Sequence, residues 1–256
     1  MNRFINESVF LYFDFICNII IYMKPLTTHI KYLDNFLLGI LAGAVIGLGG
    51  FLNLLMLSQG LKYLGGILFS VGLFSVCFFG FHLYTGRVGY IRDNDRTYGL
   101  SLLIMYIGNI IGAVGFGYLL KLTTIADAGN ILDTTASKVA LAKMISLDGN
   151  PGQSPLNMII FSFFCGIMVF LAVDIYKKSR SWLFKIGGLV ICVALFVITG
   201  MEHCIADMFY FALAGAYGSS FLACFYAILL ATVGNSLGAI VSRMTVVHIE
   251  TIAGRN

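Results

Sequence analysis

Charged residues are scarce in this chain. Asp, Glu, Lys and Arg together make up 11% of its 256 residues, whereas hydrophobic residues make up 59%, and the mean hydropathy is +0.92. An ordinary soluble domain carries roughly 25% charged residues, and a soluble core of this length does not hide so much apolar surface. The composition therefore excludes an ordinary soluble domain and predicts an integral membrane protein.

Motifs of catalysis and of metal or nucleotide binding are also missing. The sequence contains no CxxC pair, no HExxH zinc motif, and no GxGxxG or GxxxxGK[ST] phosphate-binding loop. Its six cysteines stand singly in apolar stretches and are expected to be small buried hydrophobic residues. Basic residues are dispersed and form no run of the kind that binds nucleic acid. We therefore expect no enzyme activity, metal, cofactor or nucleic-acid partner.

Six stretches are apolar over roughly the 20 residues that a membrane-spanning helix needs. They are Phe36–Leu57, Leu64–Phe81, Tyr98–Leu120, Pro155–Val173, Trp182–Met201 and Gly218–Val241. They lack the residue alternation of an outer-membrane β-barrel. A further apolar run, Cys204–Tyr217, is too short to span alone. The expected fold is all-α, with six helices spanning a lipid bilayer.

The basic residues predict the orientation in the membrane. With a cytoplasmic N-terminus and six alternating segments, 12 of the 16 Lys and Arg residues fall on the cytoplasmic side, as the positive-inside rule requires. Both termini are then cytoplasmic, and the cell membrane is the expected location. The predicted division is a cytoplasmic N-terminal segment over residues 1–33, a six-helix transmembrane domain over 34–242 and a cytoplasmic tail over 243–256.

The first residues leave two alternatives open. Val9–Met23 is apolar but short, and Asp14 interrupts it. An interfacial helix fits this pattern, and so does a translation start at Met23.

Two similar segments suggest an internal repeat. GNIIGA occupies residues 108–113, late in the third stretch, and GNSLGA occupies residues 234–239, late in the sixth. With three spans in each half, the two halves have opposite orientations in the membrane. This is the inverted repeat, here of three plus three helices, that many channels and transporters share.

Polar residues and glycine occur together at two places in the apolar sequence. The second stretch ends near HLYTG at residues 82–86, and the fifth ends near TGMEHC at residues 199–204. Ionisable residues inside a bilayer are usually functional; the alternatives are that Glu202 and His203 merely pair with each other and that His82 is an ordinary loop residue. A helix broken at such a place exposes N–H groups with partial positive charge, which attract anions. We therefore expect broken second and fifth helices.

The sequence GMEHCIADMF at residues 200–209 resembles the signature G-[FY]-E-H-[SCV]-[IV]-A-[ND]-M of the formate/nitrite transporter family. LYTG at residues 83–86 is similar to that family's L-[FY]-T loop, and the resemblance extends from Phe36 to Val241. It implies an aquaporin-like fold and a homopentamer with one pore in each subunit. The implied function is a channel for small monovalent anions of weak acids: formate, nitrite, and relatives such as acetate, lactate and hydrosulfide.

The resemblance also implies roles for single polar residues. Thr85 and His203 match the polar centre of the pore, and Glu202 is expected to help orient His203. An imidazole pKa of about 6.5 suits His203 to a proton switch for a weak acid. Further polar candidates near the helix breaks are Asn109, Asn235 and Tyr84.

Apolar and basic positions carry over in the same way. Leu73 and Phe196 match one apolar constriction, while Phe69 and Leu83 match pore-lining positions toward the cytoplasm. The vestibule lysine corresponds to Lys143. Lys138 is the alternative, because an apparent insertion over residues 146–154 separates Lys143 from the fourth stretch.

Departures from the family pattern bear on substrate size. Gly166 stands where an asparagine is common, which predicts a roomier pore that also passes acetate and lactate. His82 stands where a small or acidic residue is usual. Asp207 is expected to cap the second half-helix or to bond a neighbouring subunit.

Two other transport functions stay open at this point. A proton-coupled monocarboxylate carrier would have the same sequence features as a channel. An aquaporin-like channel for neutral solutes would share the architecture, but the paired Asn-Pro-Ala signature is missing and proline occurs only at positions 25, 151 and 155.

Overall fold

The computed structural model describes residues 28–127, 129–147 and 152–254. Residues 35–256 form one compact unit. The predicted interfacial segment Val9–Met23 lies outside the described residues. Apart from an isolated β-bridge between Ile145 and Gln153, the described residues are in helices, turns and loops, which confirms the all-α expectation.

Five helices of the described chain are long and apolar enough to cross a membrane. They are α2 (Thr28–Ser58), α3 (Lys62–Phe79), α4 (Thr97–Lys121), α6 (Pro155–Lys178) and α10 (Phe221–Ile252). Two shorter apolar helices are α7 (Trp182–Ile198), with 17 residues, and α8 (Cys204–Leu213). Each predicted apolar stretch coincides with one of α2, α3, α4, α6, α7 and α10. Because α10 continues to Ile252, most of the predicted tail is helical.

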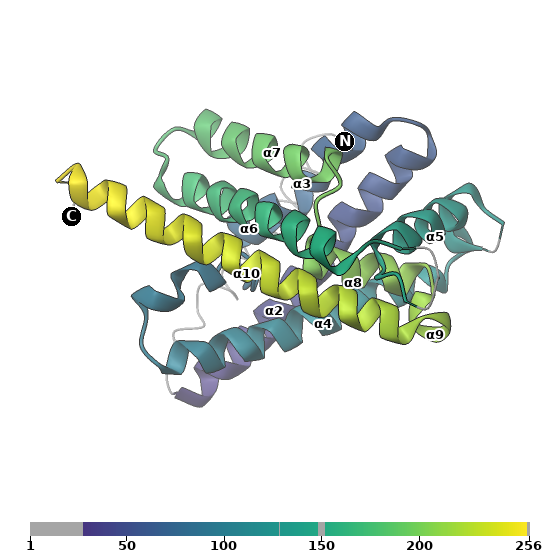
Figure 1. Cartoon of the computed structure of the whole chain (residues 1–256), viewed down its shortest axis with the longest axis horizontal. Helices are drawn as coiled ribbons and strands as arrows, with labels where there is room; N and C mark the ends of the chain where they lie inside the picture. The colour runs from purple at the N-terminus through teal and green to yellow at the C-terminus, as the bar shows by residue number, and fades with distance from the viewer. Residues whose placement is uncertain (1–27, 128, 148–151, 255–256) are drawn as a thin grey trace, which may run out of the picture. The chain divides into compact units, whose positions relative to one another are not determined.

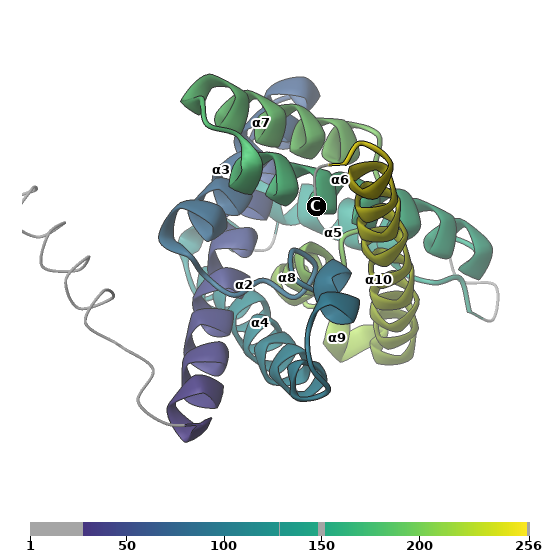
Figure 2. The same cartoon turned by 90° about the vertical axis from the view of Figure 1, so that its left-hand side faces the viewer.

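The helices pack around α8. α10 packs along α6, α6 packs against α7, and α7 packs against α3 (Figure 1). α8 lies against α4, α10 and α5 (Figure 2). Every residue from Cys204 to Leu213 is buried. A helix of 10 residues is about 15 Å long, too short to cross a bilayer, so it lies within the bundle.

Glycines allow two pairs of helices to cross closely. Where α2 crosses α4, a Cβ at Gly43 would overlap the Asn109 carbonyl; where α6 crosses α10, a Cβ at Gly166 would overlap the Asn235 carbonyl. Small residues at a crossing let two backbones approach in a membrane. The expectation that Gly166 widens a pore is therefore corrected: its missing side chain makes room for the backbone of α10.

Two further glycines face phenylalanine rings. A Cβ at Gly47 of α2 would lie 3.1 Å from the ring of Phe209 in α8. A Cβ at Gly89, in the 3₁₀ helix η1 (Val88–Asp93), would lie 2.9 Å from the ring of Phe170 in α6. In both contacts the ring fills the space that a side chain would need.

Ion pairs join three elements at one end of the bundle. Lys178 Nζ lies 2.6 Å from Glu250 Oε1 and links α6 to α10. Arg243 Nε lies 2.6 Å from Asp93 Oδ2 and links α10 to η1. The start of α4, which follows η1, is therefore near the end of α10, so these two helices run in opposite directions.

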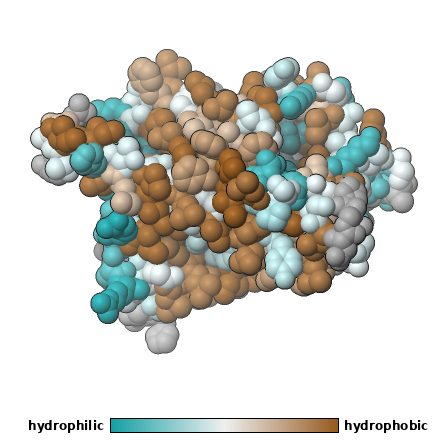
Figure 3. Space-filling model, viewed as in Figure 1, coloured by the Kyte–Doolittle hydropathy of each residue, from teal (hydrophilic) through white to brown (hydrophobic). Residues whose placement is uncertain are grey.

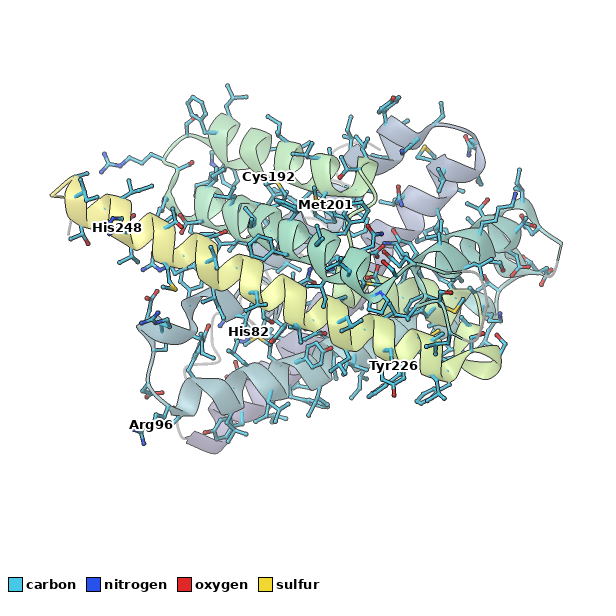
Figure 4. All side chains as sticks on the ribbon, in the orientation of Figure 1. His82, Arg96, Cys192, Met201, Tyr226 and His248 are labelled. Atoms are coloured by element: carbon cyan, nitrogen blue, oxygen red, sulfur yellow. The ribbon has the colours of Figure 1, made fainter. Side chains whose placement is uncertain are left out.

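Hydropathy divides the surface into zones. The face seen in Figure 3 has a broad apolar band with hydrophilic residues gathered toward both ends. Arg96 and His248 lie toward the end that carries the C-terminus, whereas Tyr226 lies toward the opposite end (Figure 4). This zoning fits a bundle whose helices cross a bilayer.

The connection between α4 and α6, which the sequence indicates only as a polar loop, contains regular structure. η2 (Thr124–Ala126) and α5 (Ile131–Lys143) lie there, and α9 (Ala216–Ser219) precedes α10. After α5 the chain folds back on itself: Ser146 N donates to Gln153 O at 3.0 Å, and Gln153 N donates to Met144 O at 2.9 Å. The apparent insertion thus returns to the end of α5.

Candidate functional site

A buried asparagine holds the loop between α7 and α8. Asn235 Oδ1 accepts a hydrogen bond from Cys204 N at 2.9 Å. Its Nδ2 donates to Glu202 O and to Ser162 O, both at 2.8 Å. The loop begins at Gly200, whose φ of 74° is in the left-handed region, where glycine carries no steric penalty. These bonds fix the backbone on both sides of His203.

The loop after α3 is held in the same way. Asn109 Oδ1 accepts from Tyr84 N at 2.8 Å. Its Nδ2 donates to His82 O at 2.9 Å and to Gly39 O at 2.8 Å. This loop follows Gly80, with a φ of 71°. Both predicted asparagines therefore bind loop backbone, and both are fully buried.

A cavity of about 360 Å³ opens beside the loop between α7 and α8. Six of its lining side chains matter for its chemistry: Phe69, Lys143, Phe196, Glu202, His203 and Asp207. They come from α3, α5, α7, α8 and the loop before α8, which the chain brings together from distant positions. The cavity joins a charged group of residues to an apolar group.

The apolar part of the cavity is aromatic. The rings of Phe69 and Phe196 meet edge to face with centroids 5.6 Å apart, and Phe196 stacks on the His203 ring at 5.9 Å. This corrects the expected placement of Phe69: it lies with Phe196 on the cavity. Leu73, one turn further along α3, and Leu83 are also buried, but they are not among the residues that line this cavity.

His203 is held as a neutral ring. Its Nδ1 accepts a hydrogen bond from Ala206 N at 3.2 Å and caps α8. An imidazole nitrogen that accepts carries no proton, so the ring proton is on Nε2. Nε2 lies 2.9 Å from Thr85 Oγ1 and donates to it. The Thr85 hydroxyl proton is then available to another acceptor.

Lys143 lies against two carboxylates. Its Nζ is 2.5 Å from Glu202 Oε2 and 3.1 Å from Asp207 Oδ1. Burial alone would lower the pKa of Lys143, but Asp207 and Glu202 raise it above the usual lysine range. Lys138, the alternative vestibule lysine, is exposed and is not among the residues that line the cavity.

Among the polar residues of the cavity that were missing from the predicted site are Asp207 and Gln153. Asp207 follows His203 by one helical turn, and this i, i+4 spacing was the available signal. The cap of α8 is His203, which corrects the expectation that Asp207 caps this helix; the alternative, a bond from Asp207 to a neighbouring subunit, stays a prediction. Gln153 Nε2 donates to Glu202 Oε1 at 2.7 Å. Its position depends on the fold-back after α5, for which the sequence has no pattern.

The remaining predicted residues lie away from this cavity. Tyr84 places its hydroxyl 2.9 Å from Ser236 Oγ. His82 Nδ1 lies 2.8 Å from Asn35 Oδ1, and because that oxygen can only accept, Nδ1 carries the proton. His82 and His203 thus have opposite tautomers.

The fold is a bundle of apolar helices, and its cavity holds one lysine and two carboxyl groups. These features define a multi-helix membrane protein with an internal polar site. The chain belongs to the formate/nitrite transporter family, whose sequence profile matches residues 21–249.

Named relatives share part of the chain. The formate channel FocA of Escherichia coli (strain K12) is 31% identical over 154 residues, which cover 58% of this chain and 52% of that protein. The formate channel FocB of the same strain is 26% identical over 186 residues, covering 68% and 64%. The matched part thus spans between half and two thirds of the length of these two relatives.

Solved structures have the same fold. A pentameric formate channel with formate bound superposes with a TM-score of 0.69 at 25% identity, over 89% of this chain and 98% of that chain. An FNT family ion channel superposes with a TM-score of 0.70 at 23% identity, over 82% and 86%.

Proposed function

We propose that this protein is a transmembrane channel for small monovalent anions of weak acids, with formate as the first candidate. The observation that carries the proposal is the cavity in which a buried lysine leads to the Phe69–Phe196 pair and to His203. The two relatives named above are formate channels, which supports a transport role rather than catalysis.

The residues suggest a sequence of steps. Lys143 draws an anion into the cavity from water. The Phe69 and Phe196 rings remove part of its hydration shell, which costs several kcal/mol for a bare charge and less for an anion that has taken up a proton. The Thr85 hydroxyl, oriented by His203, and the partial positive charge at the start of α8 offset that cost. Leu73 and Leu83 are the proposed apolar constriction on the far side of Thr85.

The proposed architecture is six spanning helices in an inverted repeat of three plus three, with α3 and α7 ending at broken-helix loops. The equivalent bonds of Asn109 and Asn235 support it. So do the matched glycine contacts at Gly43 and Gly166. The opposite directions of α4 and α10 are those an inverted repeat requires.

We place the protein in the cell membrane with both termini in the cytoplasm. The positive-inside count supports this. A homopentamer is the proposed assembly, because the structurally similar formate channel is pentameric. Mass measurement in detergent tests the assembly, and a monomer would contradict it.

Flux into reconstituted vesicles tests the function. Formate and nitrite are expected to enter faster than into protein-free vesicles, acetate more slowly, and lactate slowest, because Gly166 adds no room to the cavity. Sulfate is expected to stay out, since dehydrating two charges costs far more than dehydrating one. Sulfate entry as fast as formate entry would overturn the channel proposal. Trans-stimulation in a counterflow experiment would favour the proton-coupled carrier instead.

A further inference from the structure

The group formed by Lys143, Glu202 and Asp207, here called the acid–lysine cluster, has more negative than positive groups. One ammonium faces two carboxyl groups, and the exposed fractions of the three side chains are 14%, 4% and 2%. Two ionised carboxylates would leave a buried net charge of −1 at the entrance of a cavity proposed to admit anions. Like charges at one buried site favour protonation of one of them.

Other titratable groups near Asp207 do not balance that charge. Those around α8 are His203, Cys165, Cys204, Tyr210, Tyr217, Lys62 and Lys121. His203 is neutral because its Nδ1 accepts a hydrogen bond. Lys62 is exposed at the rim of the cavity, and Lys121 Nζ is directed to Leu213 O at the far end of α8.

The two carboxyl groups have different surroundings. Glu202 uses both oxygens: Oε2 faces Lys143 Nζ, and Oε1 accepts from Gln153 Nε2. Apart from the contact of Oδ1 with Lys143 Nζ at 3.1 Å, neither oxygen of Asp207 has a hydrogen-bond partner, although the side chain is buried and lines the cavity. Glu202 Oε2 and Asp207 Oδ1 lie 2.5 Å and 3.1 Å from the same Lys143 Nζ, and two deprotonated carboxylates held together at one buried site repel each other. A proton on Asp207 satisfies all of these contacts at once.

We propose that Asp207 carries a proton at neutral pH and donates this proton to a weak-acid anion that enters the cavity. The second part rests on the proposed transport function; the first does not. In the transfer, the O–H bond of Asp207 breaks and an O–H bond forms on a carboxylate oxygen of the anion. The neutral acid then passes the apolar rings, and Asp207 regains a proton from water at the outer mouth.

This assignment replaces His203 as the predicted proton switch. A proton added to His203 Nδ1 would displace the hydrogen bond from Ala206 N and remove the cap of α8. Asp207 can lose and regain its proton without breaking a backbone bond, because its oxygens accept none. Lys143 stays within reach to stabilise the carboxylate that remains after the transfer.

Infrared spectroscopy of the purified protein tests the proton directly. At neutral pH we expect a carbonyl-stretch band of a buried carboxylic acid that shifts in D₂O. Asp207→Asn should remove the band. Glu202→Gln should remove it as well, because Asp207 then becomes the sole counter-ion of Lys143 and ionises. Asp127→Asn, which changes an exposed aspartate outside the cavity lining, is the matched control and should keep the band. A wild-type protein without the band, or a band that survives Asp207→Asn, would overturn the proposal.

Formate uptake at several external pH values tests the transfer. After subtraction of the flux into protein-free vesicles, wild-type uptake should rise by up to about tenfold for each unit of acidification. Asp207→Asn should flatten this rise to less than about twofold per unit while Asp127→Asn keeps it. An unchanged slope in Asp207→Asn would show that the proton comes from elsewhere. If the wild-type protein carries no formate, the transport function fails, whereas the infrared result still decides the protonation of Asp207.

Discussion

Asn109 and Asn235 each make two bonds to a loop and one to the backbone of a neighbouring helix, but the side chains of the two loops are different. The Asn109 loop carries Leu83, Thr85 and His82, and the His82 ring is directed away from the cavity, to Asn35. The Asn235 loop presents Glu202 and His203, and Glu202 meets Lys143 from α5. Acid–base chemistry is therefore concentrated at the second loop.

The comparison separates what holds the backbone from what acts on a substrate. The asparagine amides need only peptide groups as partners, so they work the same way in both loops. The charged residues depend on α5 and the chain after it. Both loops are therefore held by an asparagine, whereas the contacts with Lys143 occur at the Asn235 loop.

Removal of the shared support should have the largest effect. Asn235→Ala leaves one N–H and two carbonyls unpaired in a buried place, and each unpaired group costs about 1–3 kcal/mol. Asn109→Ala should be equally damaging. We expect both variants to lose the folded oligomer in size-exclusion chromatography, whereas Asn94→Ala, at an exposed site, should keep it. Loss in only one variant would contradict the equivalence of the two loops.

Removal of Lys143 should abolish the ion pairing at the Asn235 loop. Lys143→Met leaves Glu202 buried without a cation, at a cost of about 3–5 kcal/mol, and formate uptake should fall with it. The exposed Lys138→Met is the control. Because the pKa of Lys143 is raised, its contribution to stability is complete below the unfolded lysine pKa of about 10.4 and declines as the pH rises toward the higher folded value. Thermal unfolding measured against pH in both variants checks this.

The glycine crossings test whether the two halves pack alike. Gly43→Ala and Gly166→Ala should each destabilise the protein by about 1–3 kcal/mol, because a methyl group forces the helices apart. Gly187→Ala in α7, where a Cβ meets nothing within 4 Å, is the matched control. The ratio of formate to acetate uptake should stay unchanged in Gly166→Ala. A marked change in that ratio would return Gly166 to the pore.

Among these variants, substitution of His203 should change the free energy of unfolding least. His203→Asn keeps a capping oxygen for α8, whereas His203→Phe loses the cap, worth about 1 kcal/mol. Both lose the bond to Thr85, so formate uptake should fall about tenfold, which corresponds to about 1.4 kcal/mol. The rise of uptake with acid should persist in His203→Asn. Its disappearance there would make His203 the proton carrier in place of Asp207.

The spanning helices were predictable because an apolar run of about 20 residues is rarely found outside a membrane-spanning helix. α5 was not, because 13 residues with several exposed polar side chains look like a loop. Thr85 and His203 stand 118 positions apart, and only the family resemblance related them. Their contact is now a structural fact, while their role in a pore stays a prediction.

Two placements failed for physical reasons. Phe69 and Leu73 lie one turn apart on the same face of α3, and the sequence does not say which of them meets Phe196. In a sequence, a glycine such as Gly166 is equally compatible with open space in a pore and with close contact between two helix backbones. Asp207 was underestimated because its importance depends on Lys143, which reaches it from another helix.

The contacts of Gly47 with Phe209 and of Gly89 with Phe170 take both glycines from the first half of the chain and both rings from the second. The positions correspond in pairs. Gly47 follows Gly43 at the same distance as Phe170 follows Gly166, and Gly89 follows Gly80 at the same distance as Phe209 follows Gly200.

A Cβ at Gly47 would also lie 2.9 Å from the ring of Phe116, which the first half itself supplies. If the two halves are repeats, as proposed, two copies of the second half would place one phenylalanine ring against another at both contacts. At these two contacts the glycines belong to the first half of the chain and the phenylalanines to the second. If the proposed inverted repeat holds, the two halves are complementary at these contacts, and a duplicate of the second half would not fit in the place of the first.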